Sequence, residues 1–291
     1  MYECAIIGTG AAGISAALTL KALNKNFIWF GDGKLSGKIR SAEKIGNYPG
    51  LSMVSGNELA ESFLSQIKEM DIRIENKTVT GVYQMEGYFS VLCNQDMYDA
   101  KTVILATGVE SVKPVKGELE FVGRGVSYCA TCDGFLYKGK TVFVVCTEKS
   151  LEHEIEYLAS LAAKVYVVAL YKNVALKSGN IEIVSGMPVE ITGGRKAEKV
   201  RFRDKEYSVD GVFMLKAAIT PSVLVSGLET ENGHVKVDRS CATNLEGCFA
   251  AGDCTGRPYQ YAKAVGEGNV CAHAVVSYLA EQKQKETLST V

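Results

Sequence analysis

The chain has 291 residues, enough for two domains, and 47% of them are hydrophobic. Its formal net charge of −1 gives no overall attraction to nucleic acid or to a membrane surface. The start, residues 1–7, lacks a basic segment and a long apolar run, so we expect neither a signal peptide nor a membrane span. Nine unevenly spaced cysteines argue against a secreted disulfide framework and favour the reducing cytoplasm.

The first predicted elements form a nucleotide-binding unit. An apolar strand over residues 3–7 leads through GTGAAG at 8–13 into an alanine-rich helix that we expect to end near Leu23. GxGxxG between a strand and a helix predicts a dinucleotide-binding turn, because glycines let a pyrophosphate approach the helix N-terminus. The next predicted strand, 27–30, ends at Gly31 instead of an acid. Asp32 comes one residue late, and the sequence leaves open whether it reaches a ribose or only forms a turn.

Further motifs recur along the chain. Asn-Tyr-Pro-Gly at 47–50 precedes a predicted helix at 57–70, and a predicted strand at 102–108 ends in Ala-Thr-Gly. Residues 248–253 again predict a strand followed by a turn. Gln260 and a Gly-Glu-Gly segment then lead into a helix that we expect to end near Ala280. The last residues, rich in Glu, Gln and Lys, are expected to form a frayed tail.

The central motif is CATCDG at residues 129–134. With two residues between them, Cys129 or Cys132 can attack an outside disulfide while the other resolves the mixed disulfide. Asp133 can exchange a proton with the departing thiol. Half of a zinc site is one alternative, but no second short cysteine pair or neighbouring histidine supplies the remaining ligands. A buried inert pair is the other alternative, and we favour redox chemistry without a metal.

Together these motifs resemble those of low-molecular-weight thioredoxin reductases over nearly the whole chain. The resemblance implies an α/β flavoprotein with two Rossmann-like, three-layer ββα domains, usually a homodimer. It implies a discontinuous FAD-binding domain at 1–112 and 241–291, and an inserted redox domain at 113–240, with hinges near 113–117 and 240–243. It places Cys132 against the flavin, assigns the attack on thioredoxin to Cys129 and makes Asp133 the acid or base. The FAD-binding residues that we expect, most of them from the resemblance, are Gly8, Gly10, Ala11, Ala12, Gly13, Gly31, Asp32, Lys38, Ile39, Asn47, Ala106, Thr107, Gly108, Gly252, Asp253, Gln260, Tyr261 and Ala262.

The inserted domain departs from that family where NADPH is expected. Between a predicted strand at 140–145 and a predicted helix at 150–162, the glycine-rich turn is replaced by Cys-Thr-Glu at 146–148. These residues bring β-carbons and a negative charge to the phosphate position. After the predicted strand at 165–168, Ala-Leu-Tyr at 169–171 replaces the basic cluster for the 2′-phosphate. A divergent nucleotide site is the alternative; we favour the hypothesis that no pyridine nucleotide binds.

An iron–sulfur protein is a chemically suitable donor, because a flavin can accept single electrons in turn. The pattern resembles the ferredoxin-dependent flavin thioredoxin reductases, with ferredoxin as donor and thioredoxin as acceptor. An FAD-dependent dithiol oxidase that uses oxygen is the main alternative, and a flavin-binding sensor without turnover is a third. Ferredoxins are generally acidic, so docking is expected on basic residues. Two candidate patches are Lys34, Lys38 and Arg40, and the run Arg195, Lys196, Lys199, Arg201, Arg203 and Lys205.

Overall fold

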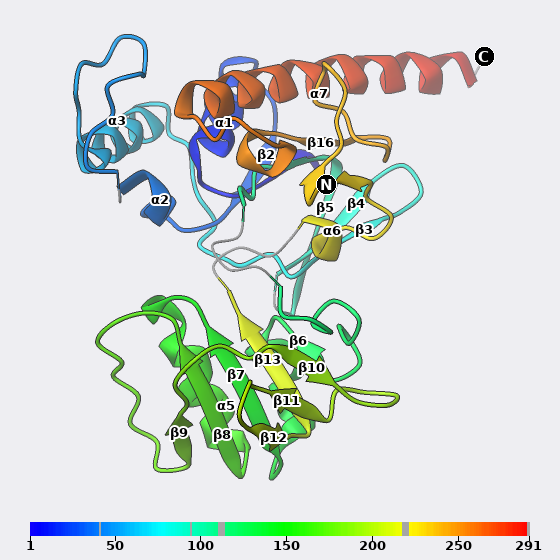
Figure 1. Ribbon diagram of the computed structural model, residues 1–291. Helices are drawn as coiled ribbons and strands as arrows, with labels where there is room; N and C mark the ends of the chain where they lie inside the picture. Colours follow the sequence, from blue (N-terminus) through cyan, green and yellow to red (C-terminus); the bar gives the residue numbers. More distant parts are fainter. Residues whose placement is uncertain (41, 94, 110–113, 217–220, 290–291) are drawn as a thin grey trace. The chain divides into compact units, whose positions relative to one another are not determined.

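The computed structural model describes residues 1–40, 42–93, 95–109, 114–216 and 221–289 (Figure 1), without the side chains of Cys132 and Ser289. The chain forms two compact units, and the second is inserted in the first: Met1–Val109 with Thr220–Val291, and Glu110–Ile219. Each unit contains a parallel sheet, which confirms the α/β class with two Rossmann-like domains.

The limits of the units can be compared with the predicted domains. The predicted boundary at 112 and 113, and the start of the hinge at 113–117, lie outside the described residues. The first unit resumes at Thr220, whereas we placed that return at residue 241. The difference arises because residues 221–240 pack on the first unit: Val225 bridges to Val82 of β3, and β15 (His234–Val235) lies against η3 (Gly252–Thr255).

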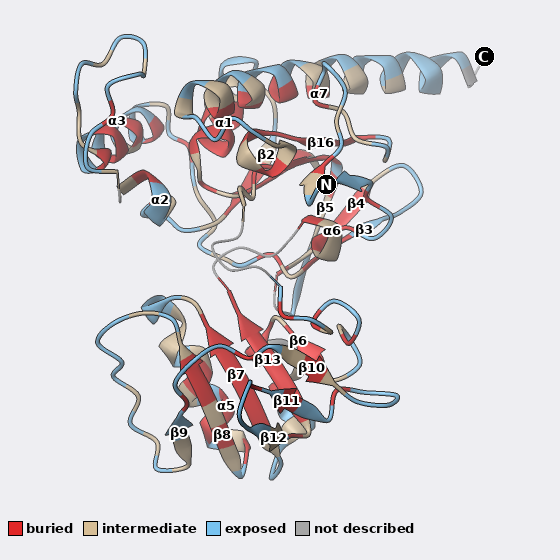
Figure 2. Cartoon of the chain, in the orientation of Figure 1, coloured by how far each residue is buried: buried red, intermediate tan, exposed pale blue. Residues whose placement is uncertain are grey.

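The sheet of the first unit has a parallel part and an antiparallel extension. Strands β2, β1, β5 and β16 are parallel neighbours in that order, and β4 and β3 continue antiparallel from β5. The apolar sequences of β1, β2, β16 and the last part of β5 suit strands that are buried on both faces, and Figure 2 shows the burial. The bounds are β1 (Tyr2–Ile7), β2 (Phe27–Phe30), β3 (Gly81–Gln84), β4 (Phe89–Cys93), β5 (Asp96–Leu105) and β16 (Cys248–Ala250).

Helices from both ends of the chain cover this sheet. Helix α1 packs against α7 so closely that a β-carbon on Gly268 would lie 2.1 Å from the carbonyl oxygen of Ala12. Ser55 and Glu58 form a capping box at the start of α3, which fixes that end of the helix. The unit's remaining elements are α1 (Ala11–Ala22), α2 (Gly37–Arg40), α3 (Gly56–Glu69), α6 (Pro221–Leu224), α7 (Tyr261–Ser289) and β14 (Thr230–Glu231).

The frayed tail that we predicted after Ala280 is wrong. Helix α7 continues without interruption to Ser289 and projects beyond the rest of its unit (Figure 1). The reason lies in the composition of residues 281–286, Glu-Gln-Lys-Gln-Lys-Glu, which are all strong helix formers. A polar sequence here marks a solvent-exposed helix.

The second unit is a three-layer ββα domain. Its parallel sheet has the order β6-β13-β7-β8-β9, and a second, antiparallel sheet has the order β10-β11-β12. Strand β7 alternates between the layers: Val142 and Val144 belong to the core shared with α5, and Phe143 and Val145 to the core shared with the antiparallel sheet. The bounds are β6 (Val126–Ser127), α4 (Ala130–Asp133), η1 (Gly134–Tyr137), β7 (Thr141–Cys146), η2 (Lys149–Leu151), α5 (Glu152–Leu161), β8 (Lys164–Ala169), β9 (Ile181–Ile183), β10 (Glu190–Thr192), β11 (Lys199–Arg201), β12 (Glu206–Ser208) and β13 (Gly211–Leu215).

Candidate functional site

The turn between β1 and α1 has the geometry of a phosphate-binding loop. Gly8 has a φ of +112°, and a β-carbon there would lie 2.2 Å from the Ala106 carbonyl oxygen. A β-carbon on Gly13 would lie 2.0 Å from the Gly8 carbonyl oxygen, so both glycines are required by close packing. Gly10, by contrast, has nothing within 4 Å of its missing side chain. Open space at the helix N-terminus is what a cofactor pyrophosphate needs.

The end of β5 lies beside this turn. The Ala106 N–H donates to the carbonyl oxygen of Ile7 at 2.8 Å, so the two strand ends are tied together. The hydroxyl of Thr107 is buried and has no hydrogen-bond partner within the described part of the chain. Gly108 has a φ of +68°, and no atom lies within 4 Å of its missing side chain. An orphaned hydroxyl beside open space fits a bound cofactor that satisfies it.

The tip of β2 forms a tight turn. Gly31 has a φ of +146° and lies against Thr9, whose Cγ2 would be 2.8 Å from an added β-carbon. One carboxylate oxygen of Asp32 accepts the N–H of Lys34 at 2.8 Å, which is an Asx turn. Asp32 therefore forms a turn, as one of the two alternatives proposed. A contact between Asp32 and a ribose stays a prediction.

Predicted cofactor residues from distant segments meet in the first unit. The amide of Asn47 donates to the Gln260 side chain at 2.5 Å, and the Tyr261 hydroxyl donates to the Lys38 carbonyl oxygen at 3.3 Å. The Lys38 ammonium donates to the carbonyl oxygen of Val109. Of the others, Ala11, Ala12 and Ile39 are buried, and Ala262 is exposed in the first turn of α7. The structure thus brings together segments that are more than 200 residues apart.

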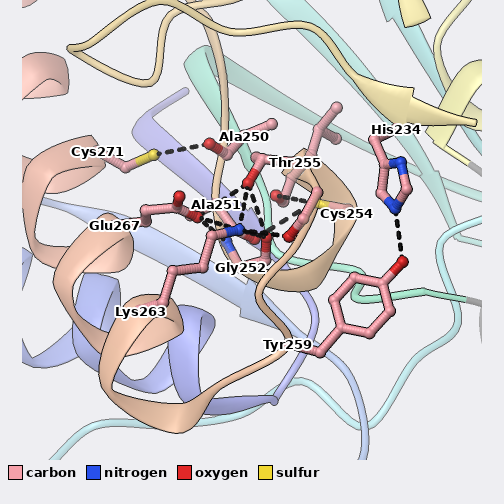
Figure 3. A network of polar contacts seen from close by, with 12 residues as sticks. His234, Ala250, Ala251, Gly252, Cys254, Thr255, Tyr259, Lys263, Glu267 and Cys271 are labelled. Carbon is pink, nitrogen blue, oxygen red and sulfur yellow. Dashed lines mark hydrogen bonds and ion pairs between the residues drawn. The ribbon is translucent and has the colours of Figure 1, made fainter. Parts of the chain in front are cut away.

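The Ala-Gly-Asp segment is held by an ion pair from α7 (Figure 3). Gly252, at a φ of +87°, donates its N–H to Glu267 Oε2 at 2.8 Å and accepts from Lys263 Nζ at 2.7 Å. Lys263 Nζ also donates to Thr255 Oγ1 and to the Gly256 carbonyl oxygen, both at 2.8 Å. The four-residue spacing of Lys263 and Glu267 indicates a helical pair. Their hydrogen bonds to the Gly252 backbone could not be predicted from the sequence.

Asp253 lies at the centre of this turn. Burial raises the pKa of the Asp253 carboxyl, and the positive charges of Lys38 and Lys263 oppose that rise. A half-buried acid between two cations can accept hydrogen bonds from a polar ligand. The turn therefore fits the predicted role of Asp253 in holding FAD.

The redox motif lies in the second unit, at the start of α4. Ser127 fixes the backbone of Cys129, because its Oγ accepts the Cys129 N–H at 3.1 Å and donates to the Cys129 carbonyl oxygen at 3.2 Å. Cys129 is disulfide-bonded, and its sulfur lies 3.4 Å from Thr131 Oγ1. The side chain of Cys132 lies outside the described residues, so its pairing with Cys129 stays a prediction.

Two carboxyl groups bear on this motif: Asp133 is part of it, and Glu154 contacts its backbone. Glu154 Oε2 accepts the N–H of Ala130 at 3.2 Å, and burial raises the pKa of that carboxyl. Burial also raises the pKa of Tyr137, with a contribution from the charge of Asp133. Our sequence interpretation included Asp133 but missed Glu154 and Ser127, whose roles depend on contacts across the fold.

The nucleotide-type turn of the second unit is filled by the protein's own atoms. The thiol of Cys146 is buried and donates to the Glu148 carbonyl oxygen at 3.2 Å, and burial raises its pKa to about 11. The Thr147 N–H donates to Leu215 of β13, and the Cys146 carbonyl oxygen accepts the Leu170 N–H at 2.9 Å. The Thr147 N–H, a backbone donor that a phosphate could use here, is thus already bonded to protein.

The segment at residues 170–178 is tied to helix α5 and to the residues just before it. Lys149 Nζ donates to the Asn173 carbonyl oxygen at 2.7 Å, and the Ala175 N–H donates to Glu152 at 2.8 Å. The side chain of Glu156 accepts hydrogen bonds from the N–H of Lys177 and from the hydroxyl of Ser178. We call these contacts the α5 latch. They hold the segment on the helix whose N-terminus would face a nucleotide.

Two other classes of site have no candidate within the described ranges. Among these residues, no group of three or more His, Cys, Asp or Glu side chains is arranged to hold a metal ion. No helix within the same ranges combines the length and apolar character that a membrane span requires.

Comparisons with known proteins agree with this geometry. A family model described as pyridine nucleotide-disulphide oxidoreductase matches residues 2–268. The thioredoxin reductase of Bacillus subtilis is 30% identical over 312 aligned positions, covering 100% of this chain and 98% of that protein. A crystal structure of a ferredoxin-flavin thioredoxin reductase from Clostridium acetobutylicum is 47% identical, with a TM-score of 0.92, and covers 97% of this chain and 99% of that chain. A second crystal structure under the same description is 50% identical, with a TM-score of 0.87, and covers 96% and 98%.

Proposed function

Because the chain belongs to the pyridine nucleotide-disulphide oxidoreductase family and is a thioredoxin reductase-type flavoprotein that binds FAD, we propose that it carries electrons from reduced ferredoxin to thioredoxin. In this proposal the Cys129/Cys132 pair delivers the electrons to thioredoxin, and NADPH takes no part. The similar proteins are reductases, which gives the dithiol oxidase hypothesis no support. The expected homodimer and cytoplasmic location stay predictions.

The observation that carries the proposal is the filled nucleotide turn. The buried Cys146 thiol lies in the turn, and the α5 latch holds the segment at residues 170–178 on the helix whose N-terminus would face a phosphate. Glu148 adds a charge: two like charges about 4 Å apart cost roughly 4 kcal/mol at an effective dielectric near 20. Such a penalty alone weakens binding about a thousandfold. These features support a donor other than a pyridine nucleotide.

The first unit holds the residues that fit FAD. The open side of Gly10, the orphaned hydroxyl of Thr107 and the fixed turn at Asp253 are the groups that would hold the cofactor. Bound FAD supplies the chemistry that links single-electron donors to a two-electron disulfide reduction. The protein's own part is to orient the cofactor and exclude water from its binding site.

The second unit supplies the thiol chemistry. The paired hydrogen bonds from Ser127 hold the Cys129 backbone, so the attacking sulfur is held in a defined place. Attack of the Cys129 thiolate on the thioredoxin disulfide forms a mixed disulfide and releases one thioredoxin thiolate, which Asp133 in its protonated form can protonate. Cys132 then attacks Cys129, which restores the enzyme disulfide and releases the second thioredoxin thiol.

The overall transfer is favourable. Plant-type ferredoxins lie near −400 mV and thioredoxin near −270 mV. The difference of about 130 mV over two electrons corresponds to roughly 6 kcal/mol. The reaction therefore needs no further energy source.

The two candidate docking patches differ in how their charges are paired. In the run from Arg195 to Lys205, Arg201 pairs with Glu190 and Lys199 pairs with Glu206 at 2.8 Å, so cross-strand acids compensate these two charges, while the other basic side chains of the run are exposed. In the other patch, Arg40 pairs with Glu61 at 3.0 Å, whereas the Lys34 side chain is exposed. We place ferredoxin docking at Lys34, because electron transfer needs the donor close to the flavin and the loop that carries Lys34 is the one that by resemblance approaches it.

The deciding experiment is anaerobic reduction of the flavin by NADPH, NADH and reduced ferredoxin in parallel. We expect ferredoxin alone to bleach the flavin and to support thioredoxin reduction. Rapid bleaching by NADPH would contradict the proposal. Oxygen-dependent oxidation of small dithiols, without ferredoxin activity at any salt concentration, would favour the oxidase.

A further inference from the structure

A charged pair lies buried in the second unit. Lys216 Nζ lies 2.6 Å from Glu118 Oε1, and the two side chains are 3% and 0% exposed. Burying a charge is expensive unless it is paired and fully hydrogen-bonded. The remaining hydrogen bonds of the Glu118 carboxylate therefore matter, because they satisfy the buried charge.

The carboxylate of Glu118 joins three separate segments. Its Oε2 accepts the N–H of Val115 at 2.8 Å, and its Oε1 accepts the hydroxyl of Tyr128 at 2.6 Å as well as the Lys216 ammonium. The chain enters this unit at Glu110 and leaves it at Ile219, so Val115 and Lys216 lie just inside the two crossings. One buried carboxylate thus joins Val115 and Lys216 to Tyr128, the residue before Cys129.

We propose that Glu118 is a positioning residue for the redox motif and acts through the hydroxyl of Tyr128. This inference rests on the proposed function of the Cys129/Cys132 pair. Tyr128 and Ser127 are the two residues before Cys129, and each is held by its side chain: Tyr128 by Glu118, and Ser127 by the Cys129 backbone. Lys216 neutralises the carboxylate that performs this role. Its ammonium also lies 5.7 Å from the centre of the Tyr128 ring, so the cation orients the ring that carries the hydroxyl.

The test deletes the hydroxyl that donates to Glu118. Tyr128→Phe keeps the ring but deletes the hydroxyl, and Tyr166→Phe, in the same unit, is the matched control because Tyr166 packs among aromatic rings. Hydrogen exchange of residues 126–131 is measured in the oxidised holoprotein. A second measurement gives the pKa of the Cys129 thiol: the reduced protein is alkylated with iodoacetamide at a series of pH values. Cys132→Ser is present in these samples, so that Cys129 is the only thiol of the motif.

We expect Tyr128→Phe to speed exchange of the Cys129 and Ala130 amides roughly tenfold, the factor that corresponds to a lost hydrogen bond to a charged group. We also expect a shifted pH profile of alkylation, with the melting temperature close to that of the Tyr166→Phe control. Tyr128→Phe behaving like the control in both measurements would overturn the proposal. The exchange experiment needs neither ferredoxin nor thioredoxin, so it remains decisive if ferredoxin fails to reduce the enzyme.

Discussion

Lys263 Nζ and Glu267 Oε2 lie 3.1 Å apart and together bind both backbone polar groups of Gly252. This places the orientation of the Asp253 turn under the control of one ion pair on α7. Lys263→Met should therefore weaken FAD binding about tenfold, since a hydrogen bond from a charged donor contributes roughly 1.5–3 kcal/mol. Equilibrium titration of the apoprotein with FAD measures the effect. Lys285→Met, on the exposed end of the same helix, should leave the affinity unchanged, and equal affinities for both variants would refute the role of the pair.

The filled nucleotide turn leads to a prediction about reversion. Cys146→Gly combined with Glu148→Gly restores the missing glycines and removes the repelling charge. We expect this double variant still to be inert toward millimolar NADPH, because the α5 latch through Lys149 and Glu152 remains. Flavin absorbance after anaerobic mixing with NADPH is the measurement. Fast bleaching of the double variant would show that the turn alone excludes the nucleotide.

The two cysteines should have different roles. Cys132→Ser should block electron flow from the reduced flavin to the disulfide of thioredoxin. Cys129→Ser should abolish thioredoxin reduction, but it leaves the Cys132 thiol, which can give a long-wavelength charge-transfer band with the flavin. Asp133→Asn should slow turnover with the disulfide intact, because the proton donor is lost. Activity with thioredoxin and the flavin spectrum are measured for each variant. Full activity of both cysteine variants would show that the motif is not the site.

Docking of ferredoxin should depend on Lys34. Lys34→Glu should raise the Michaelis constant for ferredoxin several-fold without changing the FAD content. The effect should shrink as salt shortens the Debye length, which is about 8 Å at physiological ionic strength. Lys199→Glu is the matched control, since Lys199 pairs with Glu206 in the antiparallel sheet. A larger effect at Lys199 would move the docking site to that sheet.

The buried pair in the second unit leads to a stability prediction. Lys216→Met leaves Glu118 buried without its cation, and such a loss costs about 3–5 kcal/mol. The double variant Glu118→Gln with Lys216→Met should recover most of this loss, because no uncompensated charge remains. Urea unfolding of the holoprotein measures the free energies. Lys199→Met removes an exposed pair and should change them little; an equally mild result for Lys216→Met would contradict the buried charge.

The elements that the sequence predicted well are those set by local rules. The strand at 3–7, observed as Tyr2–Ile7, the glycine turn at 8–13 and the strand at 27–30 were predicted because apolar runs and glycine spacing act over a few residues. The tail of α7 was mispredicted because a polar composition was taken for disorder, although Glu, Gln and Lys favour a helix. The missing acid at the end of β2 left Asp32 ambiguous, and the Asx turn answers only half of that question.

The contacts that organise the two sites were beyond the reach of sequence reasoning. Lys216 and Glu118 are 98 residues apart, and each alone looks like an ordinary surface charge. The α5 latch likewise joins glutamates of a helix to backbone N–H groups of a segment more than 20 residues away. Side chain to backbone contacts of this kind have no residue signature, because any residue except proline supplies the N–H group.

Trp29 is the chain's single tryptophan; it is fully buried, and its indole N–H donates to the Gly8 carbonyl oxygen at 2.9 Å. The protein therefore carries a built-in optical probe at the turn assigned to the FAD pyrophosphate. Selective excitation of the indole separates its emission from that of the tyrosines. Loss of FAD should change this emission through both the altered environment of Gly8 and the removal of an energy acceptor. Cofactor release could then be followed in real time without a label.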